Sequence, residues 1–194
     1  MKKFFSAIVA LVLAFRICSI SAFAAESTST PSDNMFLISS DDIAGVVQYN
    51  IETGNIEVPI HIDMNEQYAA EILIIISNGN ARASGVRNIS LDGYFYLKSD
   101  GTKVTVYGLA GSFKYTGATT TITGSTSYHN ATYGDWTGTH RTSTFTSDGS
   151  ATLSGYYDVY KPSGAKDNSC QLTITVNKDG TYTLGGSYSD SNVS

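Results

Sequence analysis

The chain has little cysteine and few basic residues. Its 194 residues include two cysteines, Cys18 and Cys170, and 12 basic side chains against 17 acidic ones. Clusters of lysine and arginine hold phosphate backbones and anionic surfaces, so we do not expect nucleic acid as a partner. Because Cys18 falls in the expected signal peptide over residues 1–25, Cys170 would stand alone in the mature chain, and no internal disulfide could form. Stability must then come from a buried core.

The chain also lacks the short motifs that fix a catalytic or cofactor site. It contains no Gly-x-Ser-x-Gly elbow and no glycine-rich phosphate loop. Hydrolysis by two opposed carboxylates would need a pair such as Asp135 with Asp158 or Asp92, and no sequence spacing selects one. We therefore expect no cofactor and favour a binding protein over an enzyme, with a secreted hydrolase as an alternative.

The first 25 residues have the pattern of a secretory signal peptide. Lys2 and Lys3 precede an apolar run over 4–15, and small residues lead to an expected cleavage site after Ala25. The run is shorter than the about 20 apolar residues that cross a bilayer as a helix, and Arg16 interrupts it. We expect a secreted protein of bacterial type, either free or associated with the cell envelope, with no stable membrane span after cleavage.

The remaining chain reads as one acidic domain. Residues 26–34 are rich in Ser and Thr without apolar periodicity and predict a flexible leader, 35–190 form a single β domain, and 191–194 form a tail. Three of the 12 basic residues lie in the first 25, so nine remain against 17 acidic ones, a net charge of −8. The segment 26–81 carries nine acids and no Lys or Arg. Such a segment could face a cationic partner or keep an exported protein soluble.

Turn signals and a two-residue apolar period predict the fold class. Asp-Gly pairs at 99–102, 147–150 and 178–181 separate alternating runs, and glycine supplies the backbone angles of a tight hairpin. Before the third pair, Cys170, Leu172, Ile174 and Val176 share one face and polar residues the other; Tyr182 and Leu184 continue the apolar face. We expect an antiparallel β-sandwich or partly open β-barrel of about eight to ten strands, with these hairpins at one end.

The acidic first part of the domain is less regular. Residues 46–51 and 56–62 read as two strands around a turn, and Pro59, which has no amide hydrogen, places the second strand at an edge or bulge. Asp63 and Glu66 have the spacing of a helix capping box, so at most one short helical turn is expected before the apolar run 72–76. That continuous run predicts a central strand covered on both faces.

Two further patterns concern the strand faces. Threonines repeat at every second position over 119–123 and 142–146, as on a solvated strand face. Adjacent aromatics at 94–96 and 156–157 must point to opposite faces of their strands. A second covering layer or an exposed aromatic surface would both fit, and we favour the covering layer.

The stretch 128–141 is the densest in groups that can bind a ligand, and its glycines predict a loop or irregular strand. Aromatic rings offer a platform for a sugar face, and Asp, Asn and Arg offer planar hydrogen-bond partners. The candidate binding residues are Trp136, Tyr133, Tyr128, Asp135, Asn130, His129, His140 and Arg141. Trp136 could instead be a buried anchor of the hairpin. Two imidazoles and a carboxylate could hold a metal, but neither metal-binding helix spacing is present, so none is expected.

These patterns together favour a secreted, non-catalytic β domain that binds an extracellular or cell-envelope ligand. A glycan is the most specific hypothesis, and a protein partner is open. A second alternative is an acidic inhibitor of a cationic secreted protein.

Overall fold

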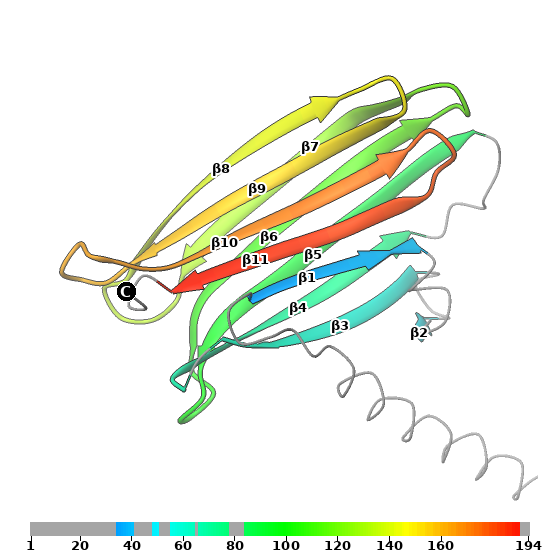
Figure 1. Cartoon of the computed structure of the whole chain (residues 1–194). Helices are drawn as coiled ribbons and strands as arrows, with labels where there is room; N and C mark the ends of the chain where they lie inside the picture. The colour runs from blue at the N-terminus through cyan, green and yellow to red at the C-terminus, as the bar shows by residue number, and fades with distance from the viewer. Residues whose placement is uncertain (1–33, 41–47, 51–54, 65, 78–83, 191–194) are drawn as a thin grey trace, which may run out of the picture. The chain divides into compact units, whose positions relative to one another are not determined.

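The structure is a computed structural model that describes residues 34–40, 48–50, 55–64, 66–77 and 84–190 (Figure 1). The expected signal peptide, nearly all of the leader and the tail lie outside these residues. Within the described residues, no apolar helix reaches the length needed to span a membrane.

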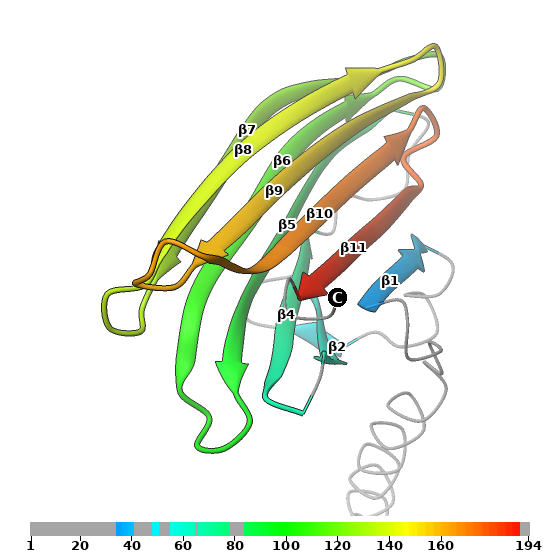
Figure 2. The ribbon, with the colours of Figure 1, turned by 60° about the vertical axis from the view of Figure 1, so that its left-hand side comes forward.

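All strand pairs in the described part of the chain are antiparallel, and they form two sheets (Figures 1 and 2). The five-stranded sheet has the order β1-β11-β10-β9-β8, and the six-stranded sheet has the order β2-β3-β4-β5-β6-β7. The strands are β1 (Asn34–Ser39), β2 (Gln48–Asn50), β3 (Asn55–Asp63), β4 (Tyr68–Ser77), β5 (Gly85–Leu97), β6 (Lys103–Tyr115), β7 (Thr120–Ala131), β8 (Thr137–Thr146), β9 (Ser150–Tyr160), β10 (Lys166–Asn177) and β11 (Tyr182–Asp190). The sheets face each other without closing into a barrel, so the predicted antiparallel β-sandwich is confirmed.

The core lies between the two sheets and follows the predicted alternation. In β10, Cys170, Leu172, Ile174 and Val176 are buried, and the intervening side chains are partly exposed. Buried Tyr182 and, beyond it, Leu184 extend this face onto β11. Each fully buried aliphatic or aromatic side chain contributes about 1.5–3 kcal/mol, which explains how the domain forms without a disulfide.

The three Asp-Gly pairs all form hairpins, but not at one end of the sandwich. The amide of Lys178 donates to the carbonyl of Gly149 at 2.7 Å, which places the β8–β9 and β10–β11 turns together. The amide of Lys98 instead donates to Gln67 at 2.9 Å, next to the β3–β4 turn. Chain direction reverses at every strand, so successive turns lie at alternate ends of the sandwich. The β8–β9 turn is the third turn after the β5–β6 turn and the β10–β11 turn is the fifth, so both lie at the opposite end from it.

Residues before β4 differ from the sequence prediction. Glu66 and Gln67 form a bend, and no helical turn is present among the described residues here. The strand that follows pairs fully along its length with β3 and β5, because its apolar residues can be buried there rather than in a helix.

β4 is a central strand, as predicted, but only one of its faces is covered. Ile72, Ile74 and Ile76 are buried, whereas Leu73 is 37% exposed. The described residues place no second layer over the outer face of the six-stranded sheet. Pro59 lies opposite Leu73 in β3, beyond the short β2, which confirms its position in an edge segment.

The aromatic runs alternate as predicted, but their outer faces carry no covering layer in the described chain. Phe95 and Tyr157 are buried, while Tyr94, Tyr96 and Tyr156 are partly exposed on the outer faces. The threonines of both ladders are exposed, in agreement with their predicted position on solvated faces.

Candidate functional site

The predicted binding residues lie on β7, β8 and the loop between them, where the chain passes from one sheet to the other (Figure 2). The sequence predicted a loop or irregular strand, whereas regular strands run to Ala131 and resume at Thr137. Side chains on a strand alternate between its two faces. The eight predicted residues are therefore distributed over several surfaces instead of being gathered in one site.

The loop between β7 and β8 holds Tyr133, Asp135 and Trp136. Trp136 is half-buried and packs against the hydrophobic core. The ring of Tyr133, which is 41% exposed, meets it edge-on at 6.2 Å between centroids, and the Trp136 amide donates to the Tyr133 carbonyl at 3.1 Å. These contacts favour the anchor hypothesis for Trp136 over a sugar platform.

His129 and His140 point inward and flank Tyr157. The Tyr157 ring lies 5.7 Å from His129 in an edge-on arrangement and 6.3 Å from His140 in a stacked one. His129 Nδ1 lies 3.1 Å from the carbonyl of Thr139, while its Nε2 is buried and has no hydrogen-bond partner among the described residues. A Cβ on Gly138 would come within 2.4 Å of the His129 ring, so the absence of a side chain at Gly138 lets β8 lie close to His129 of β7.

The surroundings of His129 indicate a structural contact between β7 and β8. Burial lowers the pKa of His129, which favours the neutral imidazole with Nδ1–H donating to Thr139. No group of three or more His, Cys, Asp or Glu side chains in the described residues is arranged to hold a metal ion.

The other predicted residues face outward on different sheets. Arg141 lies on the outer face of the five-stranded sheet, 4.7 Å above the ring of Tyr156. Tyr128 and Asn130 lie on the outer face of the six-stranded sheet, in register with Gly108 and Val106 of β6. Arg141 thus cannot share a ligand contact with Tyr128.

Tyr128 lies across β6 and reaches Asp92 on β5. Its hydroxyl donates to Asp92 Oδ1 at 3.1 Å, and Ser90 donates to Oδ2 of the same carboxylate at 2.7 Å. Gly108 is in register between them, and a Cβ there would lie 2.2 Å from Tyr128 Cε1. Burial and then the Asp92 charge raise the pKa of Tyr128 to about 12, so the hydroxyl stays a donor. One ring face remains open, since Tyr128 is 44% exposed.

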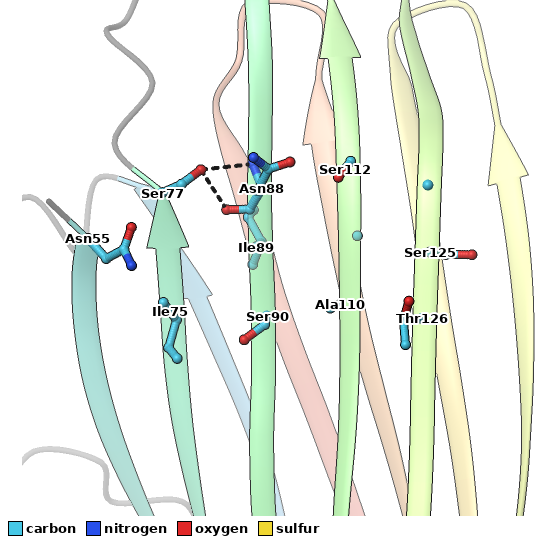
Figure 3. Close-up of a pocket in the computed structure, with 12 residues that line it drawn as sticks. Asn55, Ile75, Ser77, Asn88, Ile89, Ser90, Ala110, Ser112, Ser125 and Thr126 are labelled. Carbon is cyan, nitrogen blue, oxygen red and sulfur yellow. Dashed lines mark hydrogen bonds between the residues drawn. The ribbon is translucent and has the colours of Figure 1, made fainter. Parts of the chain in front are cut away.

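Beside Tyr128 the same outer face is hollowed, with a volume of about 450 Å³ (Figure 3). We call this pocket the hollow. Its side chains form two rows across the strands. One row is Asn55, Ser77, Asn88, Ser112 and Gly124; the other is Ile75, Ser90, Ala110 and Thr126. Ser77 Oγ accepts a hydrogen bond from the backbone amide of Asn88 at 3.2 Å and donates one to the backbone carbonyl of Asn88 at 3.3 Å (Figure 3). The hollow exists because these side chains are small.

On the side of Tyr128 away from the hollow, polar groups satisfy one another. The Tyr94 hydroxyl donates to Glu71, and the Lys103 ammonium lies 3.8 Å from the centre of the Tyr94 ring. The hydrogen bond to Glu71, with burial, raises the pKa of Tyr94 to about 12. Tyr96 lies beside it, 5.9 Å between ring centroids, and its hydroxyl is 3.4 Å from His61 Nδ1. This cluster borders Tyr128, and its Tyr94 hydroxyl is already used as a donor toward Glu71.

The carboxylates considered for hydrolysis lie on three different parts of the described structure. Asp92 lies on the outer face of the six-stranded sheet, and Asp158 lies on the outer face of the five-stranded sheet with Lys166 at 2.6 Å. Asp135, the proposed partner of either acid, belongs to the β7–β8 loop. Asp92 and Asp158 therefore cannot both lie opposite Asp135 in one site.

Sequence reasoning found Tyr128 and Asn130 but missed the hollow. Ser90, Ala110 and Ser112 carry no distinctive motif, and small residues are common in strands and turns. The available signal was the occurrence of small side chains at alternating positions in 88–90 and 110–112. Only the pairing of these strands shows that they form one surface.

Comparisons with protein-family models, with curated proteins and with solved structures give no match to this chain.

Proposed function

We propose that the mature domain is a secreted, non-catalytic β-sandwich that binds a glycan on the outer face of the six-stranded sheet, in the hollow beside Tyr128. One observation carries this proposal. A hollow lined by hydroxyl and amide side chains adjoins an exposed tyrosine ring that is fixed in place by Asp92 and by the absence of a side chain at Gly108.

This combination suits a sugar for physical reasons. A pyranose ring has an apolar face that packs on an aromatic ring, and its hydroxyl groups need both donors and acceptors. Tyr128 supplies the ring, Asn88 and Ser112 supply groups that donate and accept, and Asp92 accepts. Because Tyr128 is already held, little side-chain entropy is lost when a ligand binds.

Secretion is supported by the N-terminal sequence pattern, in which a basic start, a short apolar run and small residues precede the expected cleavage site. A glycan-binding domain that acts outside the cell would meet polysaccharides of the envelope or the surroundings. The domain's function in this proposal is attachment or recognition, with no covalent step.

The proposal is tested with the mature protein, residues 26–194, and a panel of soluble polysaccharides in affinity electrophoresis and isothermal titration calorimetry. Tyr128→Ala should abolish retardation by the polysaccharide that binds, and Tyr128→Phe should retain part of it. Tyr156→Ala is the matched control, because Tyr156 lies on the outer face of the other sheet. Absence of binding to every polysaccharide, or unchanged binding by folded Tyr128→Ala, would reject the proposal.

The salt dependence of binding separates this function from inhibition of a cationic protein. Of the acids in the first part of the domain, Asp63 contacts Lys98 and Glu71 contacts Tyr94. An interaction built on the remaining acids would weaken strongly between low and high salt, whereas sugar binding should be nearly unaffected.

A further inference from the structure

We infer that the ligand in the hollow is a single uncharged polysaccharide chain that runs across the strands and can continue past the edge of the sheet at β7. This inference rests on the proposed function and specifies its ligand class and orientation.

The shape of the hollow gives the orientation. Its lining residues on the outer face come from five consecutive strands, β3 to β7, but from only two rows along those strands, and Ile89, Gly111 and Ser125 lie in register between these rows. Neighbouring strands lie about 4.8 Å apart, so the rows extend roughly 19 Å across the sheet, against about 7 Å between the rows. An extended chain therefore makes most contacts when it crosses the strands, as the rows in Figure 3 do.

The β7 end of the hollow is open. β7 is the last strand of the six-stranded sheet, and the row there ends at Gly124, which has no side chain and is exposed. Thr126, its neighbour in the second row, is also exposed. A chain lying in the hollow can leave over this edge, so the geometry favours an internal segment of a polymer over a single terminal sugar.

The charge of the lining gives the ligand class. The residues that line the hollow are Ser, Asn, Thr, Ala, Ile and Gly, with no ionisable side chain. Asp92 lies in the row that borders one side, and Lys114, in register with Val86, lies in the row beyond the other side. Glu57 on β3 is in register with Ile75 and extends the row of Ile75 at the β3 end. Neutral hydroxyl and amide groups along the floor match a neutral chain, because a polyanion would meet two carboxylates at the border and no cation among the described lining residues.

A polysaccharide chain that crosses the strands would also meet a polar side chain on each successive strand. Ser77, Asn88 and Ser112 present polar groups from successive strands, so successive sugars of a crossing chain can each reach one. The contacts add along the chain, so affinity should depend on its length.

Chain length is the first test. Size-graded oligosaccharides of the polysaccharide that binds in the panel, from one to six sugars, are titrated into the mature protein by calorimetry. The dissociation constant should fall by about 100-fold between one and four sugars and then level off. If a monosaccharide binds as tightly as the tetrasaccharide, the crossing-chain inference is overturned while the proposed function stands; if no glycan binds, the proposed function itself has failed.

Gly124→Tyr tests the orientation. A Cβ at Gly124 would make only ordinary contacts, 3.9 Å from Ser112 Cβ, so a larger side chain can start there and add bulk at the β7 end of the hollow. Binding of the hexasaccharide should weaken at least about 10-fold, while binding of the disaccharide changes little. Gly185→Tyr is the matched control, because a Cβ there, on β11 of the other sheet, also makes only ordinary contacts at 3.6 Å. Equal hexasaccharide affinity of Gly124→Tyr and the wild type would overturn the inference.

Charge is tested with the same polymer after partial oxidation of its primary hydroxyls to carboxylates. The oxidised form should bind at least about 10-fold more weakly than the neutral one. Equal or tighter binding of the oxidised form would overturn the assignment of a neutral ligand.

Discussion

The hydroxyl of Tyr128 on β7 donates a hydrogen bond to Asp92 on β5, 3.1 Å away, across the backbone of Gly108 on the strand between them. The two residues are 36 positions apart in the chain. Their contact fixes an aromatic ring flat on a sheet whose outer face has no further layer in the described structure. The inner side of Gly108 is held as well, since the Tyr157 hydroxyl donates to its carbonyl at 2.7 Å through the core.

Gly108→Ala should displace the Tyr128 ring, because the new methyl group would lie 2.2 Å from Tyr128 Cε1 and 2.6 Å from Asp92 Oδ1. We expect glycan binding to be lost and the free energy of unfolding to fall by about 1–2 kcal/mol from overpacking. Gly185→Ala is the control and should change neither quantity, because Gly185 lies on β11 of the other sheet and a Cβ there makes only ordinary contacts at 3.6 Å. Calorimetric titration and urea unfolding measure both, and full binding by Gly108→Ala would contradict the role given to the ring.

His129 should make the stability of the domain depend on pH. Burial lowers its pKa below the usual 6.5, the neighbouring His140 acts in the same direction, and the Thr139 carbonyl and Asp158 oppose it. The folded state then binds fewer protons than the unfolded state just below pH 6.5, so the free energy of unfolding rises with pH through that interval. The stabilisation is complete above about pH 6.5 and declines as the pH falls.

Urea unfolding of the mature protein between pH 5 and pH 7.5 measures this dependence. His129→Gln can keep a donor toward Thr139 but does not titrate, so its stability should vary less over this interval. His61→Gln, on the outer face, is the control. The same pH dependence in His129→Gln as in the wild type would show that another group is responsible.

Trp136→Ala should destabilise the domain without abolishing binding. Trp136 packs against the core from the β7–β8 loop, and its loss would cost about 2 kcal/mol, less than for a fully buried tryptophan. Thermal unfolding and binding are measured on the same preparation. If the folded variant kept its stability and lost glycan binding, Trp136 would be a sugar platform after all.

Cys170 should be unreactive in the folded protein. It is buried beside Tyr107 and Tyr188, and burial raises the pKa of its thiol well above the usual value. The thiolate is the nucleophile, so labelling by a soluble disulfide reagent at pH 8 should require unfolding and should become rapid in denaturant. Rapid labelling of the native protein would indicate that this part of the core opens readily.

Much of the architecture could be predicted because it is encoded over short distances. The Asp-Gly pairs each join two strands that are adjacent in the chain, and the alternation from Cys170 to Val176 assigns one face of β10 to the core. Before β4 two local signals competed: the capping-box spacing of Asp63 and Glu66 predicted a helical turn, and the apolar run 72–76 predicted a strand. The prediction of a helical turn was wrong. A strand that pairs on both sides gains more buried surface than an isolated helical turn, so the pairing of β4 decided the outcome.

The sequence by itself determined that this protein is built from antiparallel strands with one apolar face, because turn chemistry and the two-residue period depend on neighbours in the chain. Only the tertiary structure decided which side chains share a surface. Tyr128, Asp92 and the two rows of the hollow come from strands whose register is set by long-range pairing, and a shift of one residue would turn each side chain to the other face. For that reason the candidate site can be identified from the paired strands but not from the sequence alone.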